Sequence, residues 1–166
     1  MPFPRSLVDL CIVFPDLKNV KSEEDIFRLI ETWQAKSWIN KDLKQENPGL
    51  LQGEFFRLQI DPPESILLYA NHQGGYRVFC PKSRENIAAE FSKRVTSWRA
   101  GGKRELDCPS CQEVHGLEEV LTKPKICFSK GALILKDVSS IQISEEAKED
   151  ILRYLGEVDF VYKRVG

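Results

Sequence analysis

The sequence predicts an α+β protein, a mostly antiparallel sheet packed by about three helices. Two observations support this class. Short apolar runs typical of strands follow one another in the middle of the chain with only turns between them. Three other segments repeat apolar residues every three or four positions, which is typical of helices. The chain has no glycine-rich phosphate loop, so we do not expect a doubly wound nucleotide-binding fold.

The expected strands are apolar runs that end at turn residues or prolines. Proline has no backbone N–H, so Pro15 should end the first strand and Pro62-Pro63 the second. Residues 71–75 read as a hairpin-like connection. In chain order, the expected strands cover residues 7–14, 54–61, 65–70, 76–80, roughly 116–121, 126–128, 132–138, and 159–165.

Three helices are expected between these strands. Ser22 and Ser144 each precede acidic residues, a typical N-cap followed by an acidic first turn. Gly101-Gly102 should end the central helix and Gly156 the last one. The predicted inner faces are Ile26, Leu29, Ile30 and Trp33 in the first helix, Ile87, Phe91, Val95 and Trp98 in the second, and Ala147, Ile151, Tyr154 and Leu155 in the third.

Length and composition indicate one domain over residues 1–166, with possible sub-lobes 1–61 and 62–166. The hydrophobic content of 42% is enough for a core. The net charge of −1 argues against a dedicated nucleic-acid binder, which is usually basic. The sequence has neither an 18-residue apolar run nor a signal-peptide pattern at its start, so no membrane partner and a cytoplasmic location are expected.

Five cysteines, an odd number spread along the chain, do not suggest a disulfide framework. Cys11 and Cys127 lie in apolar strand patterns and are expected to be buried core residues. The other three belong to two Cys-Pro segments. Cys108-Pro109-Ser110-Cys111 has two thiols at metal-ligand spacing, and Cys80-Pro81-Lys82-Ser83 has serine where its second thiol would lie.

Over residues 76–117, this pattern resembles a zinc ribbon that has lost one ligand. The resemblance implies a zinc-knuckle-like insertion holding a structural metal, sometimes with nucleic-acid or protein-binding roles. His115 lies four residues after Cys111 and can replace the missing thiol. The candidate metal ligands are therefore Cys80, Cys108, Cys111 and His115, and the cofactor is zinc or none.

Three other readings of this segment stay open. Cys108 and Cys111 could be a reduced, half-buried pair, with His115 on a surface turn. They could form a redox pair, although no helix pattern follows them. The segment could also hold a catalytic zinc with an open water position, for which Glu113 is the nearest acid or base.

The predicted function is that of a non-enzymatic protein that binds another protein. In size and plain chemistry the chain resembles bacterial immunity proteins, which neutralise a cognate toxin. The alternatives are a zinc-ribbon nucleic-acid-associated factor using the basic residues from Lys93 to Arg104, and a small metallo-enzyme or thiol redox protein. A protein partner, possibly a toxin, is expected, nucleic acid is not, and the oligomeric state is left open.

Overall fold

A computed structural model describes residues 8–19, 21–46, 49–71, 76–140 and 142–164. Among these residues are three α-helices, one four-stranded antiparallel sheet and two small two-stranded sheets. The predicted α+β class with mostly antiparallel pairing is therefore confirmed. The chain divides into two compact units, residues 1–73 with 127–166, and residues 74–126. We call them the sheet unit and the knuckle unit.

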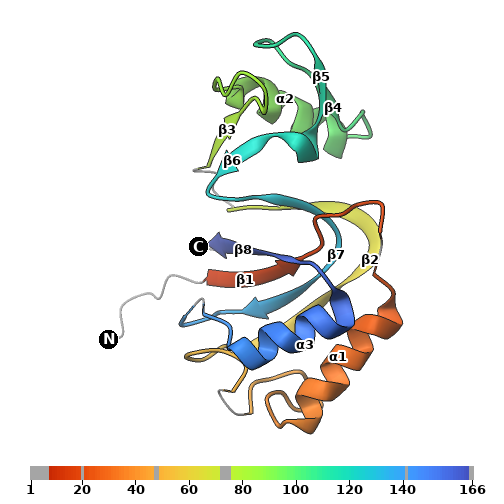
Figure 1. The fold of residues 1–166 in the computed structure, drawn as a ribbon, viewed down its shortest axis with the longest axis vertical. Helices are drawn as coiled ribbons and strands as arrows, with labels where there is room; N and C mark the ends of the chain where they lie inside the picture. Colours follow the sequence, from red (N-terminus) through yellow and green to blue (C-terminus); the bar gives the residue numbers. More distant parts are fainter. Residues whose placement is uncertain (1–7, 20, 47–48, 72–75, 141, 165–166) are drawn as a thin grey trace. The chain divides into compact units, whose positions relative to one another are not determined.

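The sheet unit contains two helices and four strands in the order β1 (Val8–Val13), α1 (Glu23–Ala35), β2 (Arg57–Tyr69), β7 (Cys127–Lys136), α3 (Glu145–Leu155) and β8 (Asp159–Arg164). The strand order across the sheet is β2-β7-β1-β8, and every neighbouring pair is antiparallel. This βαββαβ arrangement is the ferredoxin-like, or split βαβ, topology. In sequence, the knuckle unit is inserted between β2 and β7 (Figure 1).

Both helices of the sheet unit pack on one face of the sheet. Alternate residues of each strand point to that face, such as Leu10 and Ile12 in β1 and Leu133 and Leu135 in β7. The predicted inner faces of both helices are buried there, apart from the half-buried Tyr154. Lys36, just after α1, forms an ion pair of 2.6 Å with the buried carboxylate of Asp150 in α3. The helices are therefore tied by charge as well as by apolar packing.

The opposite face of the sheet has a smaller apolar cluster, and β2 and β7 both curve strongly (Figure 1). The register of the two strands shifts between Asp61 and Ile66, and Gly131 has φ of +85°. A Cβ at Gly131 would lie 3.1 Å from Pro63 Cα, so glycine also permits the close approach. The ends of the curved strands bring Tyr69 and Cys127 into one cluster with Cys11, Val13, Ala132, Ile134 and Val161.

The knuckle unit contains β3 (Arg77–Phe79), α2 (Ala88–Arg99), β4 (Glu105–Asp107), β5 (Val114–Gly116), the 3₁₀ helix η1 (Leu117–Glu119) and β6 (Leu121–Lys123). β3 pairs with β6, and β4 pairs with β5. The predicted face of α2 is confirmed for Phe91 and Val95, which are buried, and Ile87 is buried just before the helix. Trp98 is half-buried.

Several strand predictions were wrong. Pro62 and Pro63 do not end a strand but lie within β2 at its register shift, which is possible because β2 is an edge strand. Similarly, residues 126–128 and 132–138 are not two strands, because β7 continues through Gly131. Residues 117–119 form a 3₁₀ helix where a strand was expected.

The expected hairpin between residues 65–70 and 76–80 is also absent from the described residues, because β2 pairs with β7 and β3 with β6. Residues 72–75 of that connection, including His72, lie outside the described part of the chain. The unit boundaries differ from the sub-lobes 1–61 and 62–166, and the single-domain assignment stays a prediction. None of the helices in the described residues has the length and apolar character that a membrane crossing requires.

Candidate metal centre

The first Cys-Pro segment folds into a tight turn directly after β3. The backbone N–H of Arg84 donates to the carbonyl of Cys80 at 2.9 Å, and the N–H of Cys80 donates to the carbonyl of Glu85 at 2.9 Å. The turn points two more donors at the sulfur, because the N–H groups of Lys82 and Ser83 lie 3.4 and 3.3 Å from Cys80 Sγ. This is the arrangement of a metal knuckle, in which backbone dipoles stabilise a thiolate.

The second Cys-Pro segment repeats this backbone pattern between β4 and β5. The N–H of Gln112 donates to the carbonyl of Cys108 at 3.0 Å, and the N–H of Cys108 donates to the carbonyl of Glu113 at 2.9 Å. Gln112 has φ of 65°, and its counterpart Arg84 has φ of 63°. The two segments are thus two copies of one local structure, and Ser83 occupies the place of Cys111.

The two turns and β5 bring the four predicted ligands together. One donor atom from each of Cys80, Cys108, Cys111 and His115 lies within 4.8 Å of all the others. His115 Nε2 lies 3.6 Å from Cys80 Sγ and 3.0 Å from Cys111 Sγ. Cys80, Cys108 and His115 are buried, and Cys111 is half-buried.

These distances are close to those between the ligands of a tetrahedral ion. Zinc–sulfur bonds of about 2.3 Å and zinc–nitrogen bonds of about 2.0 Å give sulfur–nitrogen separations of about 3.5 Å at the tetrahedral angle. The Cys80–His115 distance of 3.6 Å agrees with that value. The Cys111–His115 distance of 3.0 Å is shorter, so Cys111 would move outward by about half an ångström on binding. Three thiols and one imidazole are a donor set that zinc prefers.

The electrostatics of the cluster favour a thiolate at Cys80. Burial raises the pKa of Cys80, but hydrogen bonds from Ser83 and from the N–H of Lys82 outweigh it and lower the pKa to about 5. At Cys111, the N–H of Glu113 lowers the pKa, while burial and the neighbouring thiols Cys80 and Cys108 raise it, with a net upward shift. The lowered pKa of Cys80 therefore favours a thiolate before a metal arrives, and the raised pKa of Cys111 means that this thiol would release its proton on binding.

Side chains at the tips of the two turns also join the knuckles to each other. Lys82 of the first turn forms an ion pair with Glu113 of the second. The hydroxyl of Ser83 lies within hydrogen-bonding distance of the hydroxyl of Ser110, which donates to Glu85 Oε2 at 3.1 Å. No local sequence pattern predicts these contacts, because they join side chains about thirty residues apart in the chain.

The structure distinguishes some of the readings left open by the sequence. His115 lies in β5, buried opposite Leu106 in β4, and not on a surface turn. Glu113, the nearest candidate acid or base, forms an exposed ion pair with Lys82, which lowers the pKa of its carboxyl group. In the basic segment, Arg104 forms an ion pair with Glu118 at 3.3 Å. Cys11 and Cys127 are buried in the sheet unit, as predicted.

No protein-family model, curated protein or solved structure matches this chain. The resemblance to a zinc ribbon therefore depends on the residues of the two turns and on the geometry of the cluster. In the knuckle unit, a Cys₃His group lies within metal-binding distance.

Proposed function

We propose that the knuckle unit is a zinc-binding module in which Cys80, Cys108, Cys111 and His115 hold one structural Zn²⁺. The convergence of these four donors within 4.8 Å of one another carries the proposal. Three of the ligands lie in one short segment after α2, namely Cys108, Cys111 and His115. The fourth, Cys80, precedes α2 in the chain. The metal would therefore connect the two ends of the unit and act as a staple for a small core.

A structural role suits this donor set better than catalysis. Four protein ligands complete the tetrahedron, whereas catalytic zinc sites keep one position open for water. Three of the four ligands are buried. The carboxylate of Glu113 is paired with Lys82. These features support the prediction that the protein is not an enzyme.

Substitution of cobalt for zinc tests the donor set directly. Cobalt(II) bound to three thiolates and one imidazole in a tetrahedron gives intense visible bands and a thiolate charge-transfer band. We expect both in the full chain, with altered bands in His115→Ala and weaker charge transfer in Cys111→Ser. Cys127→Ser, in the sheet unit, is the matched control and should leave the spectrum unchanged. Weak bands typical of six oxygen ligands would contradict the proposal.

We further propose that the whole protein binds another protein, as immunity proteins bind their toxins. Support comes from an apolar groove in the sheet unit, about 290 Å³ in volume. Phe27 lines the groove with 52% of its surface exposed, beside Ile60 and Pro63. Glu23, at the start of the acidic first turn of α1, also lines it. The groove therefore fits a basic partner surface that carries an apolar side chain.

Pull-down from the native host, followed by co-expression with a candidate toxin, tests this role. We expect one captured protein. If the Phe27 ring is a central contact, Phe27→Ala should weaken binding by about tenfold or more. Leu152→Ala is the matched control, because Leu152 is an exposed apolar residue of α3. Capture of nucleic acid with a steep salt dependence would favour the ribbon alternative. Hydrolytic or redox activity abolished by Cys111→Ser would favour the enzyme alternative.

A further inference from the structure

Strand β8 forms an edge of the sheet in the sheet unit. Among the described strands, only β1 pairs with it. The direction of the peptide groups in β1 follows from two contacts on its other side. The carbonyl of Val8 accepts from the N–H of Val138 at 2.8 Å, and the N–H of Phe14 donates to Ser129 Oγ of β7 at 2.8 Å. The even-numbered residues of β1 therefore face β7, and the odd-numbered ones face β8.

This alternation determines which peptide groups of β8 point away from the sheet. Val161 lies opposite Cys11, an odd-numbered residue, so its peptide groups point inward to β1. The peptide groups of Phe160 and Tyr162 then point away from β1, at the open edge of the sheet. The next outward N–H belongs to Arg164 and donates to Asn71 Oδ1 at 3.0 Å. The outward edge of β8 thus centres on Phe160 and Tyr162.

We propose that two copies of this chain dimerise by antiparallel pairing of β8 with β8, with the two-fold axis at Val161. The strand is self-complementary in this register. Phe160 lies opposite Tyr162 of the second copy, and Asp159 lies opposite Lys163, each pair occurring twice. Aromatic pairs and opposite charges are favourable cross-strand neighbours. Phe160 and Tyr162 both have outward peptide groups, so they form the hydrogen-bonded pairs of the new ladder.

The register also keeps the faces of the sheet consistent. Opposite residues in an antiparallel pair have their side chains on the same face, so pairing of even with even positions places the helices of both copies on one face. The result is a continuous eight-stranded sheet. Symmetric pairing of identical strands is the isologous arrangement of the commonest homodimers. The self-complementary sequence favours a second copy over an unrelated strand.

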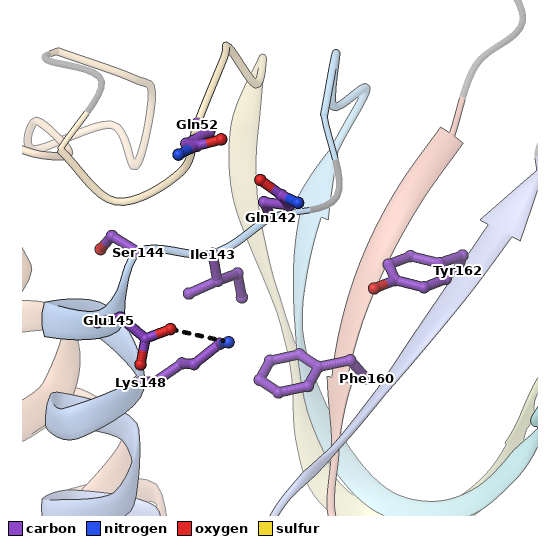
Figure 2. A pocket seen from close by; sticks show the side chains of 8 residues that line it. All are labelled: Gln52, Gln142, Ile143, Ser144, Glu145, Lys148, Phe160 and Tyr162. Atoms are coloured by element: carbon purple, nitrogen blue, oxygen red, sulfur yellow. Dashed lines mark hydrogen bonds and ion pairs between the residues drawn. The ribbon is translucent and has the colours of Figure 1, made fainter.

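The helix face beside β8 has room for the second copy. A groove of about 660 Å³ lies between β8 and the start of α3. Figure 2 shows Phe160 and Tyr162 on one side of it, across from Ser144, Glu145 and Lys148. Tyr162 has 43% of its surface exposed. In the dimer, the aromatic rings of the second copy lie next to this groove and cover the exposed ring of Tyr162.

Sedimentation equilibrium of the full, metal-loaded chain tests the proposal. We expect a dimer in reversible exchange with the monomer. Tyr162→Pro removes an outward N–H that β1 does not use, so the monomer should fold while the dimer is lost. Tyr162→Phe keeps the ring and the N–H and should still dimerise. A native protein that stays monomeric at the highest soluble concentration would overturn the proposal. A monomer that uses the edge of β8 to bind an extended segment of another protein would overturn it as well.

A charge variant tests the register independently of proline. Asp159→Lys places a lysine opposite Lys163 of the other copy, and this happens twice in the dimer. We expect the dissociation constant of the dimer to rise about tenfold because like charges then face each other. Glu157→Lys makes the same charge change just before the strand and is the matched control. Circular dichroism of both variants checks that the monomer is folded. Equal dissociation constants for the two variants would overturn the register and with it the proposed dimer.

Discussion

The two compact units of the chain differ in the size of the apolar core that each contains. In the sheet unit, two helices bury a continuous apolar core against a four-stranded sheet, with Trp33 fully enclosed. In the knuckle unit, the strands are three residues long, and one helix covers a small set of buried side chains. Small units of this kind usually need a disulfide or a metal in addition to their core. The Cys₃His group therefore lies in the unit whose core is smaller.

Metal removal should therefore affect the two units very differently, and this is the largest expected effect. Structural zinc sites in small domains contribute an apparent free energy of about 10–16 kcal/mol. On chelation, we expect the amides of α2 and β5 to lose protection from hydrogen exchange, while those of β1 and β7 stay protected. Cys108→Ser should reproduce this result. If the amides of α2 stayed fully protected from hydrogen exchange without metal, the knuckle unit would be no more dependent on metal than the sheet unit.

Truncation of the sheet-unit core should give the converse result. Trp33 is fully buried between the helices and the sheet, so Trp33→Ala should lower the free energy of unfolding by about 3–5 kcal/mol. Its zinc affinity should stay unchanged. Phe91→Ala is the corresponding change in the knuckle unit and should weaken zinc binding as well. Denaturant titrations with and without zinc separate the two outcomes. If the loss of unfolding free energy in Trp33→Ala changed with zinc, the prediction that the sheet-unit core is independent of the metal would be wrong.

The duplicated knuckle permits a rescue experiment. If about 10–16 kcal/mol is shared among four ligands, loss of one costs on the order of 3 kcal/mol, or about a hundredfold in zinc affinity. We expect this from His115→Ala. Ser83 occupies the position of Cys111 in the first turn, so His115→Ala with Ser83→Cys should recover most of the affinity. Competition with a chromophoric chelator measures both. Failure of the rescue would mean that Ser83 does not point a ligand at the metal.

The cysteines of the two units should differ in reactivity with pH. Burial, together with Asp9, raises the pKa of Cys11 to about 12. Because the thiol is protonated below that pH, only about one molecule in ten thousand has a Cys11 thiolate at pH 8. Chelation should open the knuckle unit and with it the turn that lowers the pKa of Cys80, so this thiol becomes exposed, and about a quarter of it is ionised at pH 8 with the ordinary pKa of an unfolded cysteine. Iodoacetamide should label Cys80 and not Cys11 in chelator, as peptide mass spectrometry would show.

The smallest expected effect concerns the backbone of the second turn. Gln112 has a positive φ, which costs a non-glycine residue about 1–2 kcal/mol. Glycine there relieves this cost but gains about 0.4–1 kcal/mol of freedom in the unfolded chain. Gln112→Gly should therefore stabilise the knuckle unit by at most about 1.6 kcal/mol in thermal unfolding with zinc present. A clear destabilisation would show that the Gln112 side chain makes a contribution of its own.

The comparison also explains what could be predicted from the sequence. The helices and most of the Cys₃His group were predicted because their signals are local, such as the cap at Ser22 and the spacing of Cys108, Cys111 and His115. The pairing of β2 with β7 joins strands on either side of the inserted unit, and no local pattern records it. Pro62 and Pro63 were misread because the tolerance for proline depends on an edge position, which only the folded sheet defines.

Native mass spectrometry of the purified full chain tests the central claim most directly. The proposed zinc site predicts one zinc ion per chain, retained at neutral pH and lost when Cys108→Ser removes a ligand. The mass of the complex should also show proton loss from the coordinating thiols. A folded chain that carries no zinc and takes up none when it is supplied would contradict the account.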